Sequence, residues 1–443
     1  MGRHNSYDGG TRREMSNDNQ EKVKAERPIR ALVTTLGRGH FIQVADSLRR
    51  AGVDADLTQG WVLKDPEQSW LAHVAEKIVG RRGLIYGFTR RTTPALEGHN
   101  FGDFWAEAVQ TILQMLFSRV WANERLWNWA VKVGFWMHGR TMARLLKKGD
   151  YQIAHVKSGL GRHAIAAARK RGIKVLVDHS AGAPQYIIEH VANEKWGSWS
   201  YWWTVQQDCD EADLLMVDCD FVKWTFLQYG YPEEKIRVVY MGLDSKFSGL
   251  KAWDEDLTGI GQSADKPLRI VFSGPFAPHK GNADFLAAIE KLCDSNLYFE
   301  VTVLGIPTIS DELKKRYPHA MAKIDFKGHV PQDEMCEVMR THQIYLFPSL
   351  SEGCAKSAFE AMSMGMCVVC TFETGLPMTD GTDGFLIQKQ NPDSIVEKIL
   401  WLVAHPEEMR RAGLAATETL KKYTWEAYAE NVKHIYQELL ESK

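Results

Sequence analysis

Short apolar runs alternate with helix-like patterns along most of this chain, and each run ends in a small or polar loop. The first run, residues 29–35, leads into the glycine loop Gly37-Arg38-Gly39, and apolar residues at helical spacing follow from 41 to 51. A strand, a glycine turn and a helix in this order begin a βαβ unit, whose repetition produces a parallel sheet covered by helices. Further strands are predicted at 151–156, 174–178, 212–217, 236–240, 268–272, 299–304, 324–326, 344–347 and 367–371.

A polar stretch at 248–266 interrupts this alternation and is predicted to be a linker. The fold class expected is therefore α/β, with two doubly wound, Rossmann-like domains at 29–247 and 267–425 that face each other across a cleft. Residues 1–28 are polar and charged and are expected to form a disordered tail. Residues 426–443 are expected to form a C-terminal helix that is able to cross back to the N-terminal domain.

Composition excludes several classes of protein. A net charge of −2 argues against a nucleic-acid binder. No apolar run reaches the roughly 18 residues needed to span a bilayer, and residues 1–28 have no apolar signal region, so a cytoplasmic location is expected. The seven cysteines are scattered and odd in number, as in a reducing compartment. Cys367 and Cys370 have redox-motif spacing but lie in an apolar run, which favours buried core thiols.

One segment of the first half departs from the alternation. Residues 101–147 interleave aromatic and basic residues at helical spacing: Phe104, Trp105, Phe117, Trp121, Trp127, Trp129, Phe135 and Trp136 with Arg119, Arg125, Lys132, Arg140, Arg144 and Lys147. Two interpretations are open. The segment is either a pair of core helices with solvated basic faces, or a helical insert that contacts an anionic membrane surface or a lipid acceptor.

The residues with the clearest chemistry follow the strand at 344–347. Glu352 lies in the loop at the carboxyl end of that strand, where ligands bind in doubly wound sheets. Small residues at 353–358 predict a helix start whose free N–H groups suit a pyrophosphate, and Glu360 lies two turns further on. Because carboxylates accept hydrogen bonds from neighbouring hydroxyls, the two glutamates suit a sugar and a ribose.

This Glu-x7-Glu segment, in the setting Pro-Ser-x-x-Glu-Gly…Glu-Ala-Met-x-x-Gly, resembles the retaining GT-B-fold glycosyltransferases of family 4, also called glycosyl transferases group 1. Four further segments resemble the family in the expected order: 212–244, 326–335, 382–387 and 423–425. The resemblance covers nearly all of the second half and, more weakly, the first.

The resemblance implies a role for each matching residue. Glu352 would hold hydroxyls of the transferred sugar, Lys280 would neutralise the leaving pyrophosphate, and His179 would lie near the anomeric carbon. Glu360 would bind the ribose of the nucleotide. The remaining donor-binding positions implied are Gly37, Gly39, Gly274, Gly353, Cys354, Ala355, Lys356 and Ser357.

The chain departs from the family at Pro275, where an arginine usually follows the glycine that corresponds to Gly274. Loss of that guanidinium removes a phosphate contact of about 1.5–3 kcal/mol, and Arg269 and His279 are the candidates to replace it. Asp208-Cys209-Asp210 and Asp218-Cys219-Asp220 have the spacing of a metal-binding pair but fall outside the phosphate site. No metal and no cofactor are therefore expected.

The function expected is retaining, metal-independent transfer of a hexose-type sugar from a nucleoside-diphosphate sugar to a glycan, a lipid-linked glycan or a small molecule. The alternative is a catalytically silent subunit that binds a nucleotide sugar or scaffolds a glycosylation complex. Gly37-Arg38-Gly39 lacks the third glycine of a dinucleotide motif, which argues against NAD.

Overall fold

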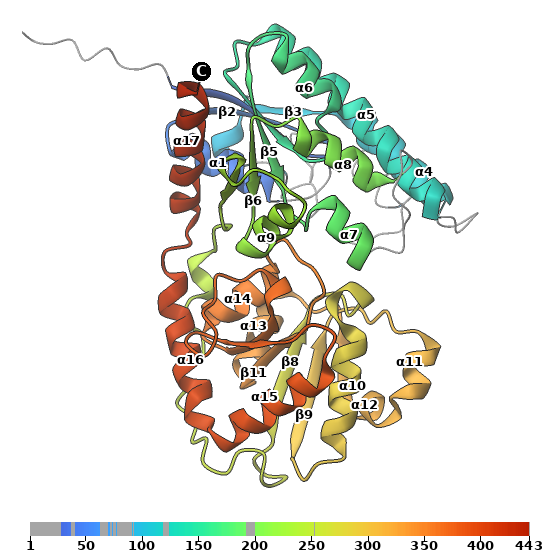
Figure 1. Cartoon of the computed structure of the whole chain (residues 1–443), viewed down its shortest axis with the longest axis vertical. Coiled ribbons are helices and arrows are strands. Elements are labelled where there is room, and N and C mark those ends of the chain that lie inside the picture. The colour runs from blue at the N-terminus through green and yellow to red at the C-terminus, as the bar shows by residue number, and fades with distance from the viewer. Residues whose placement is uncertain are drawn as a thin grey trace, which may run out of the picture.

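The computed structural model describes residues 28–36, 40–62, 70, 73, 77, 91, 93–117, 124–191, 200–251 and 253–442. These residues form two α/β halves stacked along the long axis of the molecule (Figure 1). In the N-terminal half, seven parallel strands lie in the order β3-β2-β1-β4-β5-β6-β7. They are β1 (Arg30–Thr34), β2 (Asp54–Gln59), β3 (Asn100–Gly102), β4 (Ile153–Lys157), β5 (Lys174–His179), β6 (Leu214–Val217) and β7 (Ile236–Val238).

The C-terminal half has a six-stranded parallel sheet in the order β10-β9-β8-β11-β12-β13. Its strands are β8 (Leu268–Ser273), β9 (Phe299–Leu304), β10 (Ile324–Gly328), β11 (Ile344–Phe347), β12 (Cys367–Thr371) and β13 (Phe385–Ile387). In both sheets the strand order reverses beside the first strand, which creates a switch point where ligands bind. The predicted fold class, two doubly wound sheets, is confirmed.

Helices cover the faces of both sheets. The N-terminal half contains α1 (Phe41–Arg50), α4 (Phe104–Leu116), α5 (Glu124–Lys148), α6 (Arg162–Arg169), α7 (Pro184–His190), α8 (Tyr201–Asp210) and α9 (Asp220–Gln228). The later helices are α10 (Asn282–Cys293), α11 (Asp311–Arg316), α12 (Pro318–Lys323), α13 (Gln332–Arg340), α14 (Lys356–Met364), α15 (Pro392–Ala404), α16 (Pro406–Leu420) and α17 (Trp425–Glu441). None of the described helices is long and apolar enough to cross a bilayer.

The last helix returns to the N-terminal half. Helix α17 packs on α1, and its buried residues Val432, Ile435 and Tyr436 join the core beneath β1. The backbone crosses between the halves twice, once near Leu243 and once near Tyr423. The two crossings lie side by side, since the N–H of Leu243 donates to the carbonyl of Tyr423 at 3.0 Å. In Figure 1, α16 lies along the C-terminal half and α17 along the N-terminal half.

The segment 248–266 packs on the C-terminal half, although its composition is polar. Trp253, Leu257 and Ile260 are buried there, and the Trp253 indole N–H donates to the carbonyl of Gly365 at 2.6 Å. These three apolar residues fix the path of the segment, so it is not a freely hanging connection.

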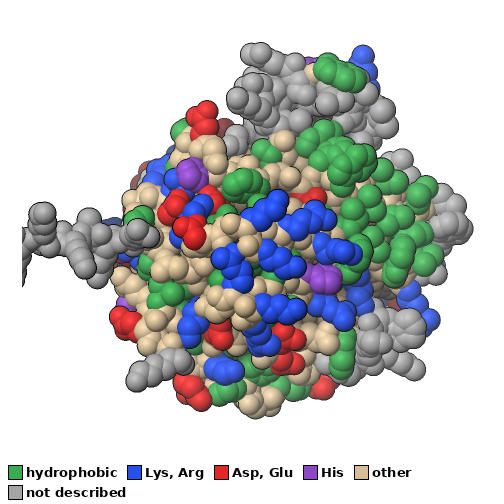
Figure 2. All heavy atoms as spheres, turned by 90° about the horizontal axis from the view of Figure 1, so that it is seen from above, with side chains coloured by type: hydrophobic (Ala, Val, Ile, Leu, Met, Phe, Trp, Pro, Cys, Tyr) green, Lys and Arg blue, Asp and Glu red, His purple; other side chains and the backbone are tan. Residues whose placement is uncertain are grey.

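Helices α4 and α5 have buried apolar residues and also many exposed aromatic residues. Ala130, Met142 and Leu146 are buried in the core, as a core helix requires. The segment exposes Trp105 (69% exposed) and Trp129 (51% exposed), and its other exposed apolar residues are Phe101 on β3 and Phe104, Ile112, Leu116, Trp127 and Trp136 on the two helices. Figure 2 shows hydrophobic side chains gathered beside a group of lysines and arginines on the face seen from above. We call these eight exposed residues of 101–136 the aromatic face.

Candidate functional site

Glu352 and Lys280 form an ion pair at the carboxyl edge of the C-terminal sheet. The Ser349 hydroxyl donates to the same carboxylate oxygen at 2.9 Å, and the N–H of Glu352 donates to the carbonyl of Glu373 at 2.9 Å. The sequence predicted both residues for the site but not their contact. The ion pair places a cation and a carboxylate side by side, close to the start of α14.

Lys280 is brought to Glu352 by a tight loop after β8. Gly281 has a left-handed φ of +73°. The loop is held against the loop after β11, because the N–H of Leu350 donates to the carbonyl of His279 at 3.0 Å and the Ser349 hydroxyl oxygen lies 3.1 Å from that carbonyl. A side chain at Gly281 would lie 1.8 Å from the carbonyl oxygen of Pro348. Only glycine satisfies both requirements.

Helix α14 begins at Lys356, so the predicted residues Gly353, Cys354 and Ala355 lie in the loop before it. The Ala355 N-cap provides no side-chain acceptor for the N–H groups of the first turn, which leaves that turn suited to an anion. The Ser357 hydroxyl is already engaged, since it donates to the carbonyl of Ser273 at 2.7 Å and accepts from the Tyr345 hydroxyl at 2.9 Å. Its structural role is to join β8 to α14.

Glu360 lies on α14 and is 4% exposed. The Lys356 ammonium is 3.7 Å from its carboxylate, and the Gln332 amide is 3.5 Å away. Burial raises the pKa of Glu360, although the charges of Lys356 and Lys246 act in the opposite direction. The carboxylate therefore has free acceptor capacity in a partly desolvated position.

Gly274 follows β8 and has a φ of +131°. A Cβ built there would lie 3.7 Å from the Ser357 hydroxyl oxygen, which is an ordinary contact distance. Pro275, the position of the missing arginine, is exposed. Arg269 does not replace it, because its guanidinium pairs with Glu300 at 3.0 Å near the opposite end of β8. His279 is adjacent to Lys280, and burial followed by the Lys280 charge lowers its pKa. Gly37 and Gly39 lie outside the described residues.

His179 ends β5 with both ring nitrogens occupied. Nδ1 lies 2.8 Å from the Ser158 hydroxyl, and Nε2 lies 3.1 Å from the carbonyl of Gly182. The ring is 2% exposed, and burial lowers the pKa of the imidazole. A sugar contact through this ring requires the loss of one of these hydrogen bonds.

The two halves touch beside Glu352. A Cβ at Gly353 would lie 2.4 Å from the carbonyl oxygen of Ser180, and the Cys219 thiol donates to the carbonyl of Gly353. Lys389 of the C-terminal half donates to the Tyr186 hydroxyl at 2.6 Å. The loop carrying Glu352 is thus in direct contact with the ends of β5 and β6.

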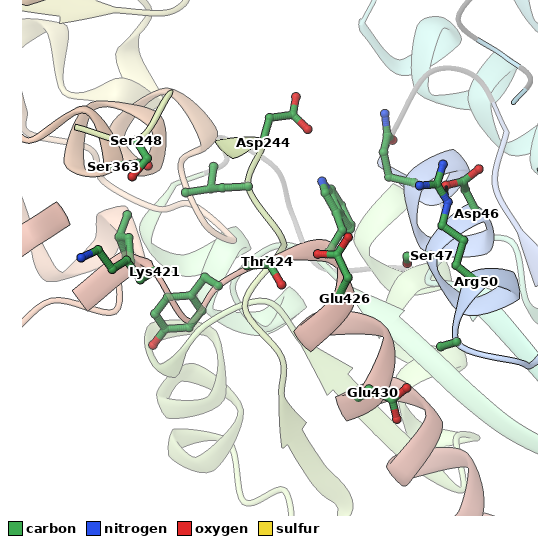
Figure 3. Close-up of a pocket in the computed structure, with 16 residues that line it drawn as sticks. Asp46, Ser47, Arg50, Asp244, Ser248, Ser363, Lys421, Thr424, Glu426 and Glu430 are labelled. Carbon is green, nitrogen blue, oxygen red and sulfur yellow. Dashed lines mark ion pairs between the residues drawn. The ribbon is translucent and has the colours of Figure 1, made fainter. Parts of the chain in front are cut away.

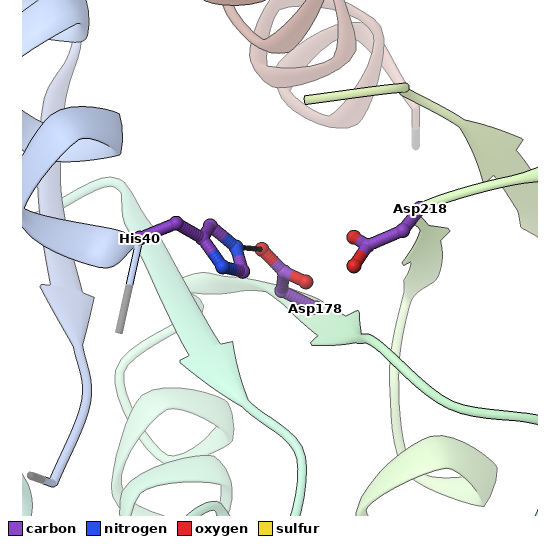
Figure 4. A group of neighbouring side chains, drawn as sticks. All are labelled: His40, Asp178 and Asp218. Atoms are coloured by element: carbon purple, nitrogen blue, oxygen red, sulfur yellow. Dashed lines mark ion pairs between the residues drawn. The ribbon is translucent and has the colours of Figure 1, made fainter. Parts of the chain in front are cut away.

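His40, Asp178 and Asp218 converge at the carboxyl edge of the N-terminal sheet (Figure 4). The His40 Nε2 atom lies 4.0 Å from Asp178, and the His155 Nε2 atom lies 3.3 Å from the same carboxylate. Burial, followed by the nearby charge of Asp178, raises the pKa of Asp218. The sequence did not predict this cluster. The available signal was that Asp178 and Asp218 both fall at the ends of predicted neighbouring strands.

A cavity of about 620 Å³ lies at the two crossings between the halves (Figure 3). Its lining comes from α1, from the crossing segments and from α17, and includes Arg50, Asp244, Lys421 and Glu426. Of the predicted site residues that the structure describes, none lines this cavity. Cys367 and Cys370 are buried, free thiols on β12, as predicted.

Family comparisons agree with this architecture. The family Glycosyl transferases group 1 matches residues 267–405, and Glycosyltransferase Family 4 matches residues 103–247. A D-inositol 3-phosphate glycosyltransferase of Streptomyces bingchenggensis is 26% identical over 226 residues, covering 48% of this chain and 50% of the relative. The sulfoquinovosyl transferase SQD2 of Arabidopsis thaliana is 22% identical over 279 residues, covering 61% and 53%. The chain thus spans about half the length of such curated relatives.

Solved structures show the same fold over nearly the whole chain. Sucrose-phosphate synthase from Thermosynechococcus elongatus has a TM-score of 0.65 at 14% identity, covering 94% of this chain and 100% of that one. HepE of Anabaena, solved with UDP and glucose, has a TM-score of 0.57 at 10% identity, covering 93% and 100%.

Proposed function

We propose that this chain, which belongs to the GT-B glycosyltransferases of family 4, transfers a hexose-type sugar from a nucleoside-diphosphate sugar to a hydroxyl acceptor with retention of anomeric configuration. The observation that carries the proposal is the Lys280–Glu352 ion pair beside the uncapped start of α14. A diphosphate bound to the helix start would draw Lys280 toward its own negative charge. Glu352 would then be free to accept hydrogen bonds from the sugar.

Each part of the site has a task in this proposal. The first turn of α14 and Lys280 hold the diphosphate and carry its charge as it departs, so the donor phosphates need no metal ion. Glu360 accepts hydrogen bonds from the ribose hydroxyls. His179, held by Ser158 and Gly182, shapes the wall near the anomeric carbon. The leaving phosphate accepts the proton of the acceptor hydroxyl on the face from which it departs.

A two-stage experiment tests this function. A thermal-shift panel of UDP, GDP, ADP and their sugars identifies the donor, because stabilisation follows affinity. Proton NMR of the product with that donor then reads the anomeric configuration directly. An inverted product would refute the retaining mechanism, and stabilisation by nucleotides without hydrolysis or transfer would favour the silent subunit. Exposed Pro275 in place of the arginine is the observation that keeps this second function in consideration.

Nucleotide affinity should fall as the pH is lowered from about 8 to about 5. The raised pKa of Glu360 means that it takes up a proton at a higher pH than an ordinary glutamate, and a protonated carboxyl is a poorer acceptor for two hydroxyls. Calorimetric titration of the identified nucleotide at several pH values measures this loss. Glu360→Gln should bind more weakly throughout and show a flatter pH dependence. Lys356→Met should move the loss to higher pH, because it removes a charge that favours the carboxylate.

We also propose that the aromatic face docks on an anionic membrane and brings a lipid-linked acceptor to the cleft. The exposed tryptophans lie beside Arg125, Arg140 and Arg144, which are also exposed, and the Arg140 guanidinium stacks 4.7 Å from the Trp136 ring centre. Aromatic rings at the lipid interface and cations at the headgroups stabilise such a contact together.

Replacing Trp105 and Trp129 with serine should weaken binding to vesicles containing anionic lipid about tenfold, because both exposed rings are lost from the interface. Co-sedimentation in about 0.1 M and about 1 M salt measures the binding and its electrostatic part. Trp401→Ser is the matched control, since Trp401 is 40% exposed but lies on α15 in the other half. Wild-type protein that stays in solution at low salt would contradict the proposal.

A further inference from the structure

Two clusters in the N-terminal half each bring two aspartates and a histidine together: Asp54, Asp56 and His99, and His40, Asp178 and Asp218. In the first cluster the carboxylates already have a cation. The Arg30 guanidinium lies 3.4 Å from Asp54 and 3.6 Å from Asp56, and Asp56 also contacts the Tyr151 hydroxyl at 2.6 Å. This cluster is a satisfied part of the structure.

The second cluster differs in charge and in hydrogen bonding. Asp178 is 1% exposed, and its Oδ1 atom has no hydrogen-bond partner. Among the described residues, no lysine or arginine forms an ion pair with Asp178 or Asp218. Lys157 acts on both carboxylates only from a greater distance. Leaving a buried carboxylate oxygen without a partner is costly, so the unpartnered Asp178 Oδ1 beside a second carboxylate points to a bound cation.

We propose that His40, Asp178 and Asp218 bind a divalent transition-metal ion, Mn²⁺ or Zn²⁺. The donor atoms of the three side chains lie within 4.8 Å of one another. Metal–ligand bonds of about 2.0–2.2 Å place neighbouring donors about 3–3.5 Å apart, so side-chain rotations of about 1 Å would complete the site. One imidazole nitrogen with carboxylate oxygens suits Mn²⁺ or Zn²⁺ better than Mg²⁺, which prefers oxygen ligands.

His155 and Tyr436 hold the Asp178 carboxylate in position. The His155 Nε2 atom contacts Asp178 Oδ2 at 3.3 Å, and the His155 Nδ1 atom contacts the Tyr436 hydroxyl of α17 at 2.8 Å. These contacts leave Asp178 Oδ1 as the free atom for the metal. Hydrogen-bonded support of this kind orients metal ligands in proteins.

The proposed metal site lies on the N-terminal half, opposite the start of α14 where the donor phosphates are proposed to bind. The chain just after Asp178 and just after Asp218 touches the loop before α14, because a Cβ at Gly353 would lie 2.4 Å from the carbonyl oxygen of Ser180 and the Cys219 thiol donates to the carbonyl of Gly353. Three protein ligands leave coordination positions open toward the cleft, where an acceptor hydroxyl would approach. The metal site stands on its own contacts and does not require that the chain transfer a sugar.

The test measures metal binding on the full chain after treatment with a chelator. Mn²⁺ is followed by electron paramagnetic resonance and Zn²⁺ by calorimetry, and one of the two should bind with one equivalent per chain. Asp218→Asn and His40→Gln should each weaken that binding at least about tenfold. The matched control Asp54→Asn removes a carboxylate of the satisfied cluster and should leave binding unchanged.

Half-buried His40 provides a variant that tests the site if Asp218→Asn fails to fold, which a melting curve detects. The proposal is overturned if neither ion binds at about 1 mM, if His40→Gln binds like the wild type, or if Asp54→Asn lowers binding as much as His40→Gln does. A rise of the melting temperature with the bound ion in wild type, absent in His40→Gln, would support it further.

Discussion

Glu352→Gln should lower the rate of sugar transfer at least about a thousandfold while the fold persists. Glutamine has the same shape and can keep the hydrogen bond from Ser349, but it cannot form the ion pair with Lys280. Its amide also provides a donor where two sugar hydroxyls need acceptors. The loss should fall on turnover more than on nucleotide affinity, because the proposed contacts of Glu352 are to the transferred sugar. Turnover with the identified donor and nucleotide binding by calorimetry measure the two effects.

Glu373→Gln is a matched control for this effect. Glu373 also carries a carboxylate paired with a lysine, at 3.2 Å from Lys389, and its backbone carbonyl holds the N–H of Glu352. Its neutralisation should change turnover far less, since its side chain pairs with Lys389 and not with Lys280. If the proposed tasks are right, Lys280→Met added to Glu352→Gln should lower turnover further, because Lys280 carries the charge of the departing diphosphate whereas Glu352 holds the sugar. A Glu352→Gln enzyme with wild-type turnover would remove Glu352 from the mechanism.

The sequence predicted most of the strands from their apolar residues but missed β2, which is rich in polar residues. The four inner strands of the C-terminal sheet are β9, β8, β11 and β12. Helices cover both of their faces, so most of their residues are apolar. Strand β2 was not predicted, because it reads Asp-Ala-Asp-Leu-Thr-Gln. Asp56 and Gln59 are buried in it and have partners distant in the sequence: Asp56 accepts from the Tyr151 hydroxyl, and the Gln59 amide N–H donates to the carbonyl of Arg91.

The sequence likewise predicted one part of the candidate site and missed another. Glu352, Glu360 and the helix start lie in one short segment, so their spacing predicted that they would share a site. The cluster of His40, Asp178 and Asp218 comes from three separate elements that only the sheet order brings together. Along the chain Asp218 lies two residues from Asp220, a spacing from which the sequence predicted no metal site, whereas the fold brings Asp218 close to Asp178. The tasks assigned to Glu352, Lys280 and His179 remain predictions.

Gly281→Ala should destabilise the protein by about 3 kcal/mol or more. At φ +73° an alanine is strained by about 1–2 kcal/mol, and its Cβ would lie 1.8 Å from the carbonyl oxygen of Pro348. A backbone oxygen cannot rotate away as a side chain can, so the loop itself must shift. Urea denaturation measures the loss of unfolding free energy.

Gly328→Ala separates the two causes of this loss. Gly328 has nearly the same backbone conformation, φ +70°, but no atom lies within 4 Å of a Cβ built there. It should therefore show the strain alone, about 1–2 kcal/mol, and the difference between the two variants measures the contact with Pro348. Because Lys280 precedes Gly281, the loop shift should also move Lys280 away from Glu352 and reduce turnover, which Gly328→Ala should leave intact. Equal stability losses in the two variants would mean that the loop moves freely, and the ion pair would then have no rigid support from this turn.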